Sequence, residues 1–436
     1  FDLVVMTDKF ASIRPFNKRE ALVAQREVFA DKDLEKALNY LDMGITVEGL
    51  KEDCKHFKSL YDFQAAVPGR FLQYYSDKTT THVSYKGLEN LDLNKSYLFI
   101  ANHRDIVMDS AYLQLYFFHN KVNTSKIAIG DNLVSTPLLL SIAKLNKMFL
   151  VKRSATLREN LANSKLLSEY IHEALAVEHE SVWIAQRNGR TKNGFDHTQQ
   201  GLVKMLTYFD ESRDVLDVLK EMHITPITVS YEYEPCDRLK ARELAISENE
   251  KYVKKPGEDF NSVCQGIFGF KGNVNFVIGK AIDAEIDVIP ADLHKNEKIN
   301  AVCQIIDKQI YANYMLFANN YIAYDYLENS AEFASQYTPQ QRETFLKYID
   351  KQSIVEDVDA KKMKKYLSIL FAVATAVALI ASCEENGDNN NEGKLDADDP
   401  GTVKTENLVA YFPLESETNA VEFGEGISYS KKAGAA

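Results

Sequence analysis

Cysteine is scarce in this chain, which has five among 436 residues. Cys54, Cys236, Cys264 and Cys303 are isolated and do not have the spacing that is typical of metal ligands. We therefore expect no metal site, and we expect these four residues to be free thiols in a reducing compartment.

Basic residues are also fewer than acidic residues, since the formal net charge is −12 at pH 7. The sequence has no basic arm interleaved with aromatic residues, so we expect no nucleic-acid partner. An acidic total still leaves room for a local basic pocket that binds a phosphate. With 45% hydrophobic and 26% charged residues the composition is that of a globular protein with a sizeable core.

Several catalytic motifs are missing. No serine lies in a Gly-x-Ser-x-Gly elbow, which argues against a serine hydrolase. The pair that begins at His172 lacks the second histidine of a zinc protease helix, because Ala176 stands in its place. The triplet that begins at His103 imitates a kinase catalytic loop, but Ser110 stands where a kinase needs asparagine. The sequence also has no Asp-Phe-Gly and no Gly-rich phosphate loop.

Short apolar runs alternate with helical patterns between residues 82 and 279. The runs predict strands at Val83–Tyr85, Tyr97–Ala101, Ile127–Ile129, Met148–Lys152, Ser181–Ala185, Ile224–Tyr231 and Val274–Ile278. The patterns between them predict helices at Ile106–Phe118, Leu138–Leu145, Ala155–Val177, Leu202–Phe209, Val215–Met222 and Phe260–Phe268. This alternation favours an α/β fold with a mostly parallel sheet flanked by helices. Pro226 inside a predicted strand indicates a sheet edge or a bulge.

The composition divides the chain into four parts. We expect an N-terminal helical subdomain over residues 1–80, the α/β domain over residues 81–285 and C-terminal helices over residues 286–356. Residues 357–436 are expected to form an apolar, signal-like helix and a disordered acidic tail.

Lysines around Met363 precede an uncharged run, small residues and Cys383. This layout is that of a secretory signal, and it resembles a bacterial lipoprotein signal in which Cys383 is the lipidated residue. Because such a signal has no role deep inside a chain, we interpret it as a second reading frame that starts at Met363 and has been joined to the first. The alternative is an anchor over residues 363–383, although the uncharged run is shorter than the roughly 20 residues of a bilayer span.

A polar turn follows the strand predicted at Tyr97–Ala101 and precedes a helix. The turn places the imidazole of His103 at the carboxyl end of a sheet, where open α/β folds bind their ligands. Asp109 lies about one turn into the helix. A carboxylate that holds an imidazole in one tautomer makes a general base, which takes a proton from a hydroxyl.

Asn102 and His103, followed by Asp109, resemble the first block of the glycerolipid acyltransferases, the glycerol-3-phosphate and 1-acylglycerol-3-phosphate acyltransferase superfamily. In that family four residues separate the histidine from the aspartate, whereas five separate them here. Either Asp109 reaches His103 through a longer turn, or Asp105 substitutes for it. Asp105 is also a candidate helix cap.

Three further segments resemble the later blocks of this family. Met148–Arg153 ends in Arg153, which the resemblance assigns to the phosphate of the acceptor. Val182–Gly194 contains a loop with the candidate substrate-binding residues Arg187, Asn188, Gly189, Arg190 and Lys192. Ile224–Ser230 resembles the fourth block, a strand with a central proline.

The resemblance implies a bacterial enzyme of phospholipid synthesis. It would transfer a fatty acyl group from acyl-CoA or acyl-carrier protein to glycerol phosphate or lysophosphatidate, without a cofactor. It would act as a peripheral protein at the cytoplasmic face of the inner membrane. Asn188 stands where the family has glutamate, so the alternative is a weakened or inactive lipid-binding relative.

Overall fold

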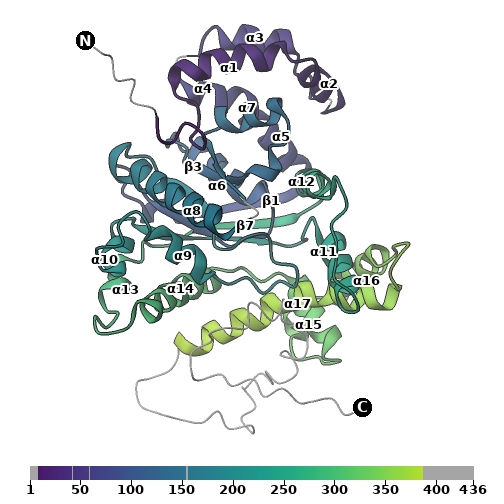
Figure 1. Cartoon of the computed structure of the whole chain (residues 1–436). Coiled ribbons are helices and arrows are strands. Elements are labelled where there is room, and N and C mark those ends of the chain that lie inside the picture. Colours follow the sequence, from purple (N-terminus) through teal and green to yellow (C-terminus); the bar gives the residue numbers. More distant parts are fainter. Residues whose placement is uncertain (1–7, 42, 58, 154–155, 386–436) are drawn as a thin grey trace, which may run out of the picture.

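The computed structural model describes residues 8–41, 43–57, 59–153 and 156–385, with side chains up to residue 372 in the last helix. Its centre is a seven-stranded sheet (Figure 1). In their order across the sheet the strands are β1 (Thr80–Lys86), β7 (Gly272–Ile278), β6 (Ile224–Tyr231), β2 (Leu98–Ala101), β5 (Val182–Ala185), β3 (Lys126–Gly130) and β4 (Met148–Val151). All neighbours run parallel except β6 and β7, which are antiparallel. The predicted α/β class and the seven predicted strands are confirmed.

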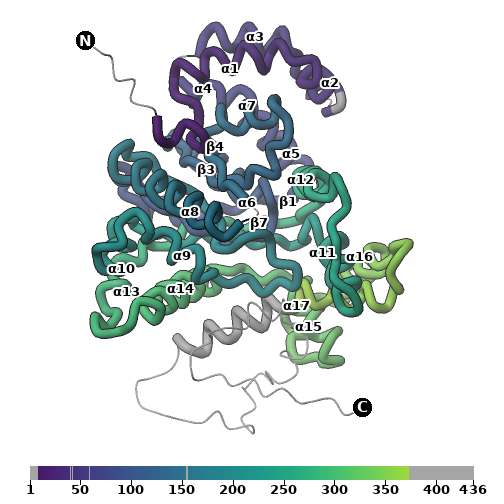
Figure 2. Tube along the Cα trace, in the orientation of Figure 1, coloured from purple at the N-terminus to yellow at the C-terminus, as the bar shows by residue number. Residues whose placement is uncertain are grey.

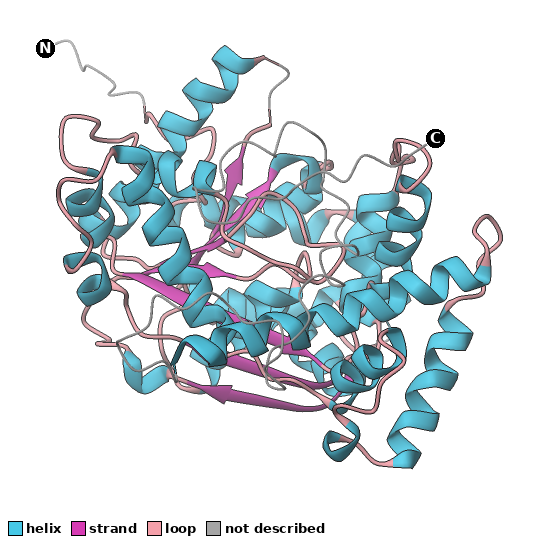
Figure 3. Ribbon diagram, turned by 90° about the horizontal axis from the view of Figure 1, so that it is seen from below, coloured by secondary structure: helices cyan, strands magenta, loops and turns pink. Residues whose placement is uncertain are grey.

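Helices cover both faces of the sheet (Figure 3). The elements between the strands are η2 (Leu88–Asn90), α6 (Met108–His119), η3 (Asp131–Leu133), α7 (Pro137–Leu145), α8 (Leu157–His172), η4 (Glu173–Val177), α9 (Gln200–Leu206), α10 (Val215–Lys220), α11 (Asp237–Ser247) and α12 (Glu258–Phe268). Each of the six helices predicted in this region overlaps one of them. Helix α11 was not predicted.

Strand β2 is buried on both faces, because its side chains alternate between two cores. Leu98 and Ile100 pack with residues of α8, α9, α10 and the C-terminal helix α14 (Lys295–Ala312). Phe99 and Ala101 pack on the opposite face with residues of α6 and α12. Burial on both faces explains why the strand is a continuous apolar run. Each large side chain buried in this way contributes about 1.5–3 kcal/mol.

Pro226 lies in the middle of the sheet, so the prediction of an edge or a bulge is wrong. It pairs with Ile100 of β2, while β7 ends at Ile278, opposite Ile227. The N–H of Gly279 donates to the carbonyl oxygen of Pro226 (2.8 Å). The nitrogen and the carbonyl of a strand residue face the same neighbour, so the nitrogen of Pro226 faces a position beyond the end of β7. The proline therefore removes no ladder hydrogen bond there.

The N-terminal and C-terminal helices lie at opposite ends of the molecule in Figure 2. The first group contains α1 (Lys18–Ala30), α2 (Lys32–Leu41), α3 (Val47–Cys54), α4 (Leu60–Gln64), η1 (Ala65–Gly69) and α5 (Arg70–Thr79). The second contains α13 (Asp283–Asp287), α14 (Lys295–Ala312), α15 (Ala318–Leu327), η5 (Ala334–Gln336), α16 (Pro339–Gln352) and α17 (Ala360–Glu385). The domain boundaries at residues 80, 285 and 356 stay predictions.

Helix α17 begins inside the C-terminal helical cluster. Met363, Leu367 and Phe371 are buried against residues of α11, α15 and α16. Among the residues that the structure describes, no helix combines the length and the apolar character needed to cross a bilayer. The lipidation of Cys383 and the joined reading frame stay predictions, and the predicted acidic tail falls on residues 386–436, outside the described residues.

We predict that Gly266→Ala destabilises the fold by about 1–3 kcal/mol through overpacking. Gly266 lies inside α12, where a Cβ would stand 2.0 Å from Oδ2 of Asp105. That carboxyl group is not free to retreat, because its Oδ1 accepts the N–H groups of Val107 and Met108 (2.9 and 2.8 Å). Urea unfolding measures the loss.

The matched control is Gly201→Ala in α9, where a Cβ would have no neighbour within 4 Å. An alanine there is expected to leave the unfolding free energy unchanged or to raise it by up to about 1 kcal/mol. Equal stabilities of the two variants would contradict the packing described for Gly266.

Candidate active site

The candidate site is built on the turn between β2 and α6. Asn102 fastens the start of this turn to β6, since its Nδ2 donates to the carbonyl of Val229 (2.9 Å) and its Oδ1 accepts the N–H of Val229 (2.8 Å). The side chain amide thus continues the pairing of β2 and β6 beyond the end of the strand. His103 follows directly, at the carboxyl end of β2.

His103 is paired with Asp109, the first of the two aspartates considered from the sequence. Nδ1 of His103 lies 3.1 Å from Oδ2 of Asp109. The N–H groups of Arg104 and Asp105 donate to the same oxygen at 2.8 Å each. These two hydrogen bonds close the turn around the carboxylate. His103 and Asp109 are therefore in contact although five residues separate them in the sequence.

Asp105 binds backbone N–H groups at the start of α6. Through Oδ1 it caps the first turn of α6, as its residue type favours. Its Oδ2 is directed at Gly266 of α12, the position where a Cβ would collide with it. The carboxyl group that contacts the imidazole is therefore that of Asp109 and not that of Asp105.

Burial sets the protonation of the pair. The side chain of His103 is 13% exposed and that of Asp109 is fully buried. Burial lowers the pKa of His103 to about 4, so the ring is neutral at pH 7. Burial raises the pKa of Asp109 to about 7, against the lowering effect of the Asp105 N–H, the Tyr231 hydroxyl and the Arg104 N–H.

The hydrogen bonds of Asp109 fix the tautomer of the ring. Oδ2 already accepts two N–H groups, so it also accepts from Nδ1 of His103, which carries the proton of the neutral ring and leaves the lone pair on Nε2. Within the described residues, Nε2 has no hydrogen-bond partner, whereas Nδ1 is bound to Asp109. The arrangement suits a general base that receives a proton at Nε2.

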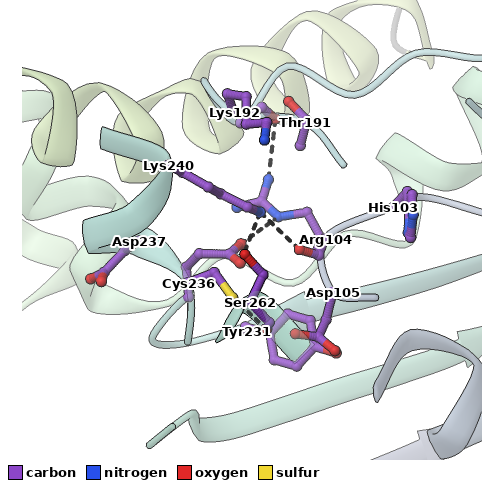
Figure 4. A network of polar contacts seen from close by, with 12 residues as sticks. His103, Arg104, Asp105, Thr191, Lys192, Tyr231, Cys236, Asp237, Lys240 and Ser262 are labelled. Atoms are coloured by element: carbon purple, nitrogen blue, oxygen red, sulfur yellow. Dashed lines mark hydrogen bonds and ion pairs between the residues drawn. The ribbon is translucent and has the colours of Figure 1, made fainter. Parts of the chain in front are cut away.

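A buried cluster of charges lies directly behind the turn (Figure 4). Nε of Arg104 donates to Glu234 (2.9 Å), and Nζ of Lys240 donates to the other oxygen of Glu234 (2.9 Å). Lys240 also donates to the backbone carbonyl of Arg104 (2.8 Å). All three side chains are buried, and Glu234 is the shared anionic partner of the two cations. Sequence reasoning did not identify this cluster, because Arg104 lies more than a hundred residues from Glu234 and Lys240.

The predicted cationic residues do not form one group. Arg153, exposed beyond the end of β4, donates to the side chain of Asn188 (3.3 Å). Arg190 is buried, and the charges of Asp105 and Glu234 act on it. Lys192 forms an ion pair with Glu243 of α11 (2.7 Å).

The loop that carries these cations touches the turn. The N–H of Thr191 donates to the carbonyl of His103 (3.2 Å), and the N–H of His103 donates to Asp196. Gly189 has a φ of +77°, which favours glycine at this point of the loop, and Arg187 is half-buried. Arg153 and Asn188 are in contact, whereas Arg190 is buried and Lys192 is paired with Glu243. The binding roles of these residues stay predictions.

Four of the cysteines lie in the described part of the chain. Cys54, Cys236, Cys264 and Cys303 are free. Among the described residues, no group of three or more histidine, cysteine, aspartate or glutamate side chains is placed to hold a metal ion.

Comparison with known proteins gives a match over the segment that contains this turn. Residues 82–230, about a third of the chain, match the model of the Acyltransferase family. The matched segment contains β2, α6 and the His103–Asp109 pair. The search of curated proteins finds no match.

Among solved structures, the chain is similar to the crystal structure of the 1-acyl-sn-glycerophosphate (LPA) acyltransferase PlsC from Thermotoga maritima. The two share 13% sequence identity with a TM-score of 0.32, over 67% of this chain and 96% of that chain. A likeness of this degree does not bear on the substrate.

We predict that Glu234→Ala lowers the unfolding free energy by about 3–5 kcal/mol, because it leaves two buried cations without their shared partner. The control is Glu211→Ala, which breaks an exposed pair with Lys165 and is expected to change the stability little. Thermal and urea unfolding compare the two variants. A similar, small effect in both would contradict the account of the cluster.

Proposed function

We propose that this protein is an O-acyltransferase of phospholipid synthesis. It transfers a fatty acyl group from acyl-CoA or acyl-carrier protein to the hydroxyl of glycerol phosphate or lysophosphatidate. The observation that carries the proposal is the contact between His103 and Asp109 inside the segment that matches the Acyltransferase family. Because the acyl chain is lipid-soluble, we place the reaction at the cytoplasmic face of the inner membrane.

In this mechanism His103 is the general base. Nε2 takes the proton of the acceptor hydroxyl while Asp109 stabilises the charge that forms on the ring. The acceptor oxygen attacks the thioester carbonyl directly, so a C–O bond forms and the C–S bond breaks. The proton on Nε2 then passes to the leaving thiolate, and no acyl-enzyme forms.

Two further groups support the transfer. Arg153 binds the phosphate of the acceptor, since its guanidinium offers paired donors at an exposed position. Asn188, which Arg153 contacts, lies at the same place and helps to orient the acceptor.

We predict that His103→Ala lowers acyl transfer by roughly 10²–10⁴-fold, the range expected for loss of a general base, and leaves the unfolding temperature nearly unchanged. The assay pairs radiolabelled glycerol 3-phosphate or lysophosphatidate with acyl-CoA or acyl-carrier protein, and products are separated by thin-layer chromatography. His56→Ala is the control, because His56 is exposed and lies outside the segment that matches the Acyltransferase family.

Equal transfer by wild type and His103→Ala would eliminate the mechanism. A wild-type protein that binds lysophosphatidate but transfers nothing in any of the four pairings would overturn the proposed activity. That result would favour a lipid-binding relative of the same fold.

A further inference from the structure

We infer that Tyr231 is a positioning residue, which holds Asp109 ionised and oriented towards His103. The inference rests on the proposed function, in which Asp109 supports the general base. Tyr231 is the last residue of β6 and does not belong to the turn that carries His103. Its hydroxyl donates to Oδ1 of Asp109 at 2.9 Å.

The two oxygens of Asp109 have separate sets of donors. Oδ2 faces the ring of His103 and the two N–H groups of the turn. Within the described residues, Oδ1 has one hydrogen-bond donor, the hydroxyl of Tyr231. The carboxylate is fully buried, so no water replaces a lost donor without rearrangement. Tyr231 therefore donates the hydrogen bond to Oδ1, the oxygen that the N–H groups of the turn do not reach.

The packing around Tyr231 fixes the direction of its hydroxyl. Tyr231 is opposite Val274 in the antiparallel pairing of β6 and β7, and its side chain is 4% exposed. Its side chain lies on the same face of β6 as those of Ile227 and Val229, the face that packs against α6. Its ring also packs against Tyr112 of α6, with ring centroids 6.2 Å apart. The sheet and α6 thus hold the phenol in place on two sides.

Loss of this hydroxyl has a specific chemical consequence. Without its donor, Oδ1 of Asp109 is a buried oxygen that binds a proton more readily. With a proton on Oδ1, Asp109 is neutral and no longer stabilises the charge that forms on the ring when Nε2 takes a proton, while Oδ2 still accepts from Nδ1. His103 is then a weaker base, so activity is lost at a higher pH than in the wild type.

Other groups also set the proton affinity of the pair. The charged groups that act on Asp109, His103 or the adjoining Asp105 are Arg104, Asp105, Arg190, Asp196, Glu234 and Lys240. The neighbouring phenols of Tyr112 and Tyr314 carry no charge, because burial raises the pKa of both groups. All of them stay in place when Tyr231 is replaced by phenylalanine. A change in titration is therefore assigned to the lost hydroxyl.

The first test compares the pH dependence of kcat/KM for wild type, Tyr231→Phe and the control Tyr112→Phe. Tyr112 is an equally buried tyrosine in contact with Tyr231, and among the described residues its hydroxyl makes no hydrogen bond to Asp109. We expect the acid limb of Tyr231→Phe to move up by about one pH unit, with roughly tenfold lower kcat/KM below the limb. The limb of Tyr112→Phe is expected to stay where it is in the wild type.

The second test does not depend on acyl transfer. Proteins with ¹⁵N-labelled histidine are titrated by NMR, and His103 is assigned by comparison with His103→Ala. We expect the ¹⁵N shifts of His103 to follow the loss of charge on Asp109, with a midpoint at a higher pH in Tyr231→Phe than in the wild type. Unchanged titration of His103 in Tyr231→Phe, or an equal shift in Tyr112→Phe, would overturn the inference. If the NMR shift occurs while no variant transfers an acyl group, the proposed function fails and the positioning role holds.

Discussion

One buried carboxylate, that of Asp109, joins the three elements on which the candidate site is built. It belongs to α6, it accepts two N–H groups and the imidazole from the turn after β2, and it accepts the hydroxyl of Tyr231 from β6. A buried carboxylate without donors takes up a proton or destabilises the fold. The position of His103 therefore depends on all of these contacts at once.

The buried cluster of Arg104, Glu234 and Lys240 connects this turn with the C-terminal helices. Glu234 binds the side chains of Arg104, beside His103, and Lys240, on α11. The next residue of α11, Ala241, is buried in the cluster that α15, α16 and α17 form. The C-terminal helices thus support the turn through α11, although they lie outside the segment that matches the Acyltransferase family.

The sheet was predictable because its strands are short apolar runs, which is what burial on both faces requires. Helix α11 was not, since its buried face contains Ala241, Ala245 and the paired Lys240 instead of an apolar stripe. The sequence also left Asp105 and Asp109 as alternatives, because the choice depends on how the turn closes. Tyr231 and Glu234 lie more than a hundred residues from the turn, and no local pattern indicates a contact over that separation.

The central claim is that Asp109 keeps the proton of His103 on Nδ1, so that Nε2 acts as the base. Asp109→Asn tests it most directly, because the amide keeps the shape of the side chain but has no negative charge to stabilise the protonated ring. Steady-state acyl transfer is measured at saturating acceptor and donor. The account predicts that kcat falls by roughly 10²–10⁴-fold while the KM for the acceptor changes little. Turnover equal to that of the wild type would contradict it.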